Sequence, residues 1–251
     1  MSNRWLVATP LSFAFLLFLL APIRGAVGQA VPAVASSPPL PPEAAGDLLF
    51  AHGEFLEAID AYNHAPADAA TFNKIGVAWH HLSAVDQAKR SYEKALNLRP
   101  DFPEALNNLG ATYFAEKRYG QAIRLYQRAL QLSPGSAVFA ANLGTAWFAE
   151  GKSTQGLEAY RTAFAKDPTV FDLDSPQIIN GPITDQERAQ QDYCIAVLFA
   201  EMNNLDRALE YLRKAFAAGF KDRKRLWQDH AFIELRTTAD FAELIGEVQL
   251  H

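Results

Sequence analysis

The chain has 251 residues, 49% of them hydrophobic, and a formal net charge of −5. This length is enough to bury a core without disulfides or metal ions. The negative charge argues against a nucleic-acid-binding protein, which needs a basic surface. The single cysteine, Cys194, excludes an intramolecular disulfide and a CxxC metal or redox site, and its apolar neighbours predict a buried thiol.

The first 30 residues have the layout of a secretory signal peptide. Arg4 precedes an apolar run over residues 11–21, and Gly28-Gln29-Ala30 fits a small-x-small cleavage site. We therefore expect cleavage after Ala30 and a periplasmic or secreted protein. The alternative is an uncleaved inner-membrane anchor, although the run is shorter than the roughly 20 residues of a membrane span. Residues 31–44 are rich in proline and alanine, which predicts an extended linker.

Residues 69–170 carry a pattern with a period of 34 residues, which predicts helical hairpins over 69–102, 103–136 and 137–170. Small residues allow two helices to approach closely, large aromatic residues fill the space around these contacts, and proline ends the second helix. We expect the glycines and the first alanine set to form the contact within each hairpin. The recurring sets are Gly76, Gly110 and Gly144; Trp79, Tyr113 and Trp147; Ala88, Ala122 and Gly156; Tyr92, Tyr126 and Tyr160; Ala95, Ala129 and Ala163; and Pro100, Pro134 and Pro168.

Two less regular repeats flank this region, so that the repeat domain is expected over residues 45–222. Gly46 and Tyr62 place a first repeat from about residue 39, with Pro66 shortening its second helix. Residues 189–222 fit a last repeat with a turn at Asn203-Asn204. Between them, proline and glycine predict a loop insertion over 171–188, either a solvated connector or part of a binding face.

The tail over residues 223–251 is expected to form capping helices that cover the last open apolar face. Thr237 and Asp240 resemble a capping box at the start of a final helix. Four apolar residues then share one face of that helix: Phe241, Leu244, Ile245 and Val248.

The 34-residue pattern resembles the tetratricopeptide repeat family. The resemblance implies an all-α fold, an α-solenoid of about five helix-turn-helix repeats, whose concave groove holds peptides or helices of partner proteins. Members of this family also self-associate.

The first helix of each repeat would line the groove. One groove row carries Lys74, Asn108 and Asn142, with Asn73 and Asn107 beside it. In the family, such asparagines hydrogen-bond the backbone of an extended peptide; the alternative is that asparagine is simply common at this place.

A second groove row consists of aromatic or histidine side chains, which either anchor partner side chains or serve packing. Its members are Phe50, His80, Phe114 and Phe148.

The sequence offers no catalytic constellation: there is no phosphate-binding loop and no nucleophile elbow. His80 and His81 are adjacent on a helix and point about 100° apart, which disfavours a shared metal. We therefore predict an exported, non-catalytic scaffold that needs no cofactor or metal and binds a protein or peptide, with no nucleic-acid partner. The alternative is a membrane-tethered assembly factor of an envelope complex, which uses its convex face or the inserted loop.

Overall fold

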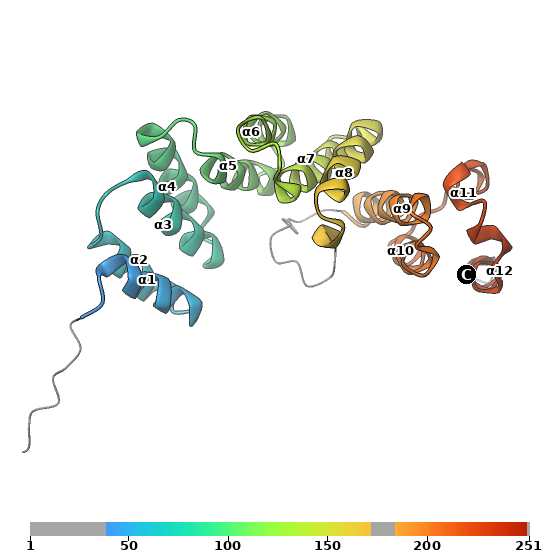
Figure 1. Cartoon of the computed structure of the whole chain (residues 1–251), viewed down its shortest axis with the longest axis horizontal. Coiled ribbons are helices and arrows are strands. Elements are labelled where there is room, and N and C mark those ends of the chain that lie inside the picture. The colour runs from blue at the N-terminus through green and yellow to red at the C-terminus, as the bar shows by residue number, and fades with distance from the viewer. Residues whose placement is uncertain (1–38, 172–183, 250–251) are drawn as a thin grey trace, which may run out of the picture. The chain divides into compact units, whose positions relative to one another are not determined.

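The computed structural model describes residues 39–171 and 184–249, and every regular element in these ranges is helical (Figure 1). The predicted signal peptide, most of the linker and most of the insertion lie outside the described residues. Among the helices that are described, none is long and apolar enough to cross a membrane. The predicted all-α class is confirmed.

Four helical hairpins follow one another between residues 42 and 166. In the three regular repeats the first helix has 13 residues and the second has 14, whereas the second helix of the first repeat has only 9 and ends before Pro66, as predicted. The bounds are α1 Pro42–Ala51, α2 Phe55–Asn63, α3 Ala69–His81, α4 Val85–Leu98, α5 Pro103–Ala115, α6 Tyr119–Leu132, α7 Ala137–Ala149 and α8 Ser153–Lys166.

Each repeat glycine lies against the tyrosine of its own hairpin, 16 residues later in the chain. A Cβ atom added at Gly46, Gly76, Gly110 or Gly144 would come closer than 3.0 Å to the tyrosine ring. The glycine is therefore required because the ring occupies the space of a side chain. The close approach was predicted, but its main partner is the tyrosine rather than the small residue of the second helix. Gly144 alone also meets a backbone atom there, the carbonyl oxygen of Gly156, at 3.0 Å.

The turn between the two helices of each hairpin contains one residue in the left-handed region. Glycine takes this place in two hairpins, but the others use serine, lysine or asparagine. This conformation closes the end of the first helix and lets the chain reverse within a few residues. The five residues are Gly53, Ser83, Lys117, Gly151 and Asn203, with φ between 57° and 80°.

Successive repeats stack with alternating chain direction, so that the end of a second helix packs against the start of the next first helix. Ala129 near the end of α6 lies in one apolar cluster with Leu106 and Phe139, near the starts of α5 and α7. At the opposite ends, Lys89 early in α4 forms an ion pair with Glu116, which follows α5, at 3.0 Å. Consecutive helices of the four repeats are therefore antiparallel.

The fifth hairpin breaks this rule. It consists of α9 Asp185–Glu201 and α10 Leu205–Ala217, and it follows a 3-10 turn, η1 Pro168–Phe171. Phe164 near the end of α8 packs edge-on against Phe199 near the end of α9, with ring centroids 5.1 Å apart, and Arg161 pairs with Glu201 at 2.5 Å. Thus α8 and α9 run in the same direction, and the last hairpin is reversed relative to the regular repeats. Its residues 185–188 are helical, which corrects the predicted extent of the loop.

The tail forms α11 Arg223–Gln228, two 3-10 turns, η2 His230–Phe232 and η3 Leu235–Thr237, and α12 Ala239–Gln249. Phe241, Leu244 and Ile245 are buried as predicted, while the side chain of Val248 lies outside the described residues. The hydroxyl that caps α12 belongs to Thr238, which accepts a hydrogen bond from the Phe241 amide, and not to Thr237. Thr237 instead donates to the Glu234 carbonyl.

Candidate functional site

The asparagines of the first helices form a continuous chain of amide hydrogen bonds. Asn108 Nδ2 donates to Asn73 Oδ1 at 3.0 Å, and Asn142 Nδ2 donates to Asn107 Oδ1 at 2.9 Å. Asn107 Nδ2 donates to Asn108 Oδ1 at 3.3 Å and so joins the two pairs. The chain of bonds connects α3, α5 and α7, and it satisfies amide groups that would otherwise be costly to bury.

Lys74 occupies the equivalent place at the junction of the first two repeats. Its Nζ donates to Glu43 Oε1 and to both carboxylate oxygens of Asp47, each at 2.8 Å. Partial burial opposes the charge of Lys74, but the hydrogen bonds from the two carboxylates outweigh it and raise the pKa of Lys74. At each of these three junctions, a donor from one repeat therefore meets an acceptor from the repeat before it.

This pairing limits what the asparagines offer a partner. Asn142 is 1% exposed and Asn107 is buried as well, whereas Asn73, Lys74 and Asn108 are partly exposed. The side chain of Asn142 is therefore inaccessible to a peptide in this structure. Peptide contacts at the other residues of this row stay a prediction.

The aromatic row also serves packing. Phe114 is 2% exposed and Phe148 is 6% exposed, so neither ring is an open anchor. Phe50 packs edge-on against Phe55 and His81, and within this row only His80 is exposed. Of the two interpretations of this row, the structure favours packing for Phe114 and largely for Phe148.

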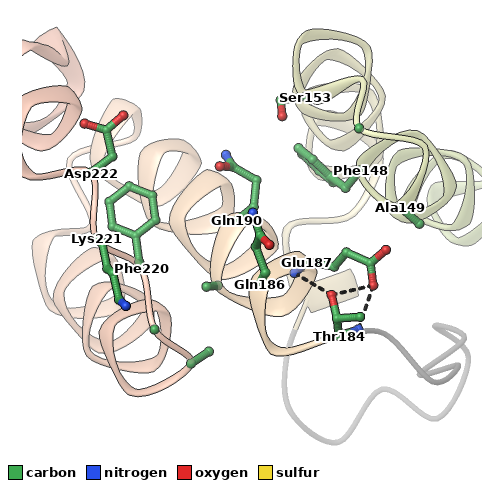
Figure 2. A pocket seen from close by; sticks show the side chains of 14 residues that line it. Phe148, Ala149, Ser153, Thr184, Gln186, Glu187, Gln190, Phe220, Lys221 and Asp222 are labelled. Atoms are coloured by element: carbon green, nitrogen blue, oxygen red, sulfur yellow. Dashed lines mark hydrogen bonds between the residues drawn. The ribbon is translucent and has the colours of Figure 1, made fainter.

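A cleft of about 870 Å³ lies where the reversed hairpin meets the fourth repeat (Figure 2). It is bounded by the α7–α8 turn, the first turns of α9, and the segment that joins α10 to α11. Phe148, Ala189 and Phe220 give it an apolar floor, while neutral polar and charged groups form its rim. The lining residues are Phe148, Ala149, Gly151, Ser153, Thr184, Gln186, Glu187, Ala189, Gln190, Ala218, Gly219, Phe220, Lys221 and Asp222.

Several rim groups of this cleft already have intramolecular roles. Thr184 and Glu187 form a reciprocal capping box at the start of α9, seen as the dashed bonds in Figure 2. Asp222 accepts a hydrogen bond from the Arg225 amide at 2.9 Å and so caps α11. Gln190 accepts from Arg225 and donates to the sulfur of Cys194. These bonds hold the walls of the cleft in place.

Other rim groups remain available to a ligand. The side chains of Ser153, Gln186 and Lys221 form no hydrogen bond or ion pair with the described part of the chain. A hydroxyl, an amide and an ammonium group together can accept from and donate to the peptide groups of an extended segment. Sequence reasoning missed this cleft, because it depends on the direction of the last hairpin.

Nothing in the described residues forms a reactive centre. No group of three or more histidine, cysteine or acidic side chains could hold a metal ion there. Burial raises the pKa of the Cys194 thiol, which disfavours the reactive thiolate. Burial also raises the pKa of Asp192 to about 6, against the influence of Lys214 and Arg188.

Comparison with known proteins identifies the repeats. The family described as "Tetratricopeptide repeat" matches residues 103–136, and a related "TPR repeat" family matches residues 82–117. No curated protein matches the chain in sequence. These matches and the hairpin geometry define a protein that contains tetratricopeptide repeats stacked as an α-solenoid.

Solved structures share this fold. A structure of the MamA protein is 22% identical to the chain, covers 75% of it and 93% of its own length, and gives a TM-score of 0.50. MamA from residue 41 to its end, from Desulfovibrio magneticus RS-1, is 19% identical, covers 70% of this chain and 92% of its own, and also gives 0.50. The chain therefore has the fold of these tetratricopeptide solenoids.

Proposed function

We propose that the chain is a non-catalytic scaffold that holds an extended segment of a partner protein in the cleft between the fourth repeat and the reversed hairpin. The observation that carries this proposal is the cleft itself, with an apolar floor and unsatisfied polar groups at its rim. The volume of about 870 Å³ lies within the range of ligand sites in proteins. An apolar side chain of the partner fits against Phe148 and Phe220, while its peptide groups meet the rim.

The cleft is a better candidate than the asparagine rows as they stand. Asn107, Asn108 and Asn142 bond to neighbouring repeats, so a peptide that used them would have to displace existing hydrogen bonds. Ser153, Gln186 and Lys221 require no such exchange. Because the walls are fixed by helix caps, binding costs little ordering of the scaffold itself.

Site-specific crosslinking in cells tests this proposal. A photoreactive amino acid replaces Gln186 at the cleft rim or, as the control, Glu243 on the exposed side of α12. We expect a partner that crosslinks at position 186 and not at 243. Equal crosslinking at both positions, or none at 186, would contradict the assignment.

A matched pair of variants then tests whether the cleft must be empty. Ala218→Trp places an indole at the cleft, whereas the neighbouring Ala217→Trp places it on an exposed part of α10. We expect the first change to reduce affinity for the crosslinked partner at least about tenfold and the second to leave it nearly unchanged. Comparable losses would show that the partner binds elsewhere.

We propose in addition that residues 1–30 direct export, on the strength of Arg4, the apolar run and the small-x-small sequence that ends at Ala30. N-terminal sequencing of the protein from the cell envelope checks this. A mature chain that begins at residue 31 supports cleavage, and an intact N-terminus in the membrane supports the anchored alternative. Recovery of the whole protein from the cytosol would refute export.

A further inference from the structure

We propose that the chain associates head to tail with further copies of itself, through α2 of one copy and α11 of the next. This inference concerns surfaces outside the cleft and does not depend on the proposed partner. It follows from two small exposed faces of opposite charge, each of which carries a large apolar side chain.

The acidic face consists of Leu56, Glu57 and Asp60 on α2. Leu56 is 58% exposed, and Asp60 follows it by four residues, so the two share one side of the helix. No lysine or arginine occurs between residues 40 and 73. Lys74 pairs with carboxylates of α1, and it leaves Glu57 and Asp60 without an ion pair to any described residue.

The basic face consists of Lys224 and Trp227 on α11. Trp227 is 52% exposed and lies three residues after Lys224, so both project from the same side of the helix. The indole stands edge-on to the buried Phe241, with centroids 5.7 Å apart and planes at 90°, which fixes its orientation. An exposed but immobilised tryptophan is typical of the side chains that dominate protein interfaces.

The acidic residues next to α11 do not neutralise this face, because they are used as caps. Asp222 accepts from the Arg225 amide, and Asp229 accepts from the Ala231 amide and the Tyr193 hydroxyl. Lys224 itself has no ion pair among the described residues. The face therefore presents an unpaired ammonium group beside an apolar ring.

The two faces are complementary in both charge and hydrophobicity. Leu56 can pack on the Trp227 ring while Asp60 or Glu57 pairs with Lys224. Since the two faces differ, the contact is heterologous: each copy leaves one face of each kind open, and open chains form rather than closed dimers. The faces are small, so we expect weak association that depends on protein concentration and weakens with salt.

Charge exchange tests the inference on the full chain. Sedimentation velocity at increasing concentration should show wild-type species larger than the monomer. Asp60→Lys alone and Lys224→Glu alone should each stay monomeric, because like charges then face each other. An equimolar mixture of the two variants should associate again, because the lysine introduced on α2 of one copy meets the glutamate introduced on α11 of the other, and the unchanged faces also pair.

Control variants separate this interface from general effects of charge. Glu243→Lys in α12 makes the same charge change as Asp60→Lys at another exposed site, and it should leave association unchanged. Circular dichroism confirms that each variant is folded. The inference is overturned if the wild-type chain stays monomeric, if the mixture of variants fails to associate, or if Glu243→Lys abolishes association as Asp60→Lys does.

Discussion

Gly144→Ala should destabilise the fold, although alanine normally favours a helix. The gain from helix propensity is about 1 kcal/mol. Against it, the new Cβ meets the Tyr160 ring and lies 3.0 Å from the Gly156 carbonyl oxygen, so moving the ring alone cannot relieve the clash. Such overpacking costs about 1–3 kcal/mol. Displacing Tyr160 would also break its buried hydrogen bond with Thr145, worth about 1 kcal/mol.

The expected net loss is therefore about 2 kcal/mol, which lowers the melting temperature by roughly 4–8 °C in a domain of this size. Thermal unfolding followed by circular dichroism measures it. Gly120→Ala in α6 is the control, because nothing lies within 4 Å of the added Cβ there, and it should leave the melting temperature unchanged or raise it. If both variants shift the temperature in the same direction and by similar amounts, the steric argument is wrong.

Three further outcomes follow from the described contacts. Asn142→Ala leaves Asn107 Oδ1 without its donor and should cost about 1–3 kcal/mol in urea unfolding; the double variant with Asn107→Ala should cost less than the sum of the two single changes. Burial raises the pKa of Asp192 from 3.8 to about 6, so the folded state carries a penalty that grows as pH rises through this range. Asp192→Asn should thus stabilise the chain by about 1–2 kcal/mol at pH 7 and by little at pH 4, and equal effects at both pH values would contradict the assignment. The Cys194 thiol, 0% exposed, should react with a thiol reagent only as fast as the chain opens, and fast reaction in the native state would show that the fifth hairpin is looser than described.

The sequence predicted the regular repeats well because their signals are local. Gly76 and Tyr92 lie within one hairpin, and the same pair recurs at a fixed spacing, so packing, period and chain reversal all indicate the same structure. The shortened α2 follows from Pro66 alone. The left-handed residues Ser83 and Lys117 were missed, since neither residue type favours that conformation.

The candidate site was harder to predict because tertiary contacts decide it. An asparagine amide can bond to a peptide or to another asparagine, and the sequence alone does not separate these partners. Asn108 and Asn142 proved to bond to the preceding repeat. The cleft exists because α9 runs alongside α8 in the same direction, and no periodic signal in residues 167–184 specifies that direction.

The reversed hairpin also determines where the protein could lengthen. A duplicated 34-residue unit inserted between the second and third repeats would find an antiparallel neighbour on each side and the same type of polar junction. A unit added after α8 would meet a helix that runs the wrong way, and its glycine and tyrosine would face no matching surface. Growth by duplication is thus confined to the interior of the array, and the cleft and the cap would be carried outward unchanged.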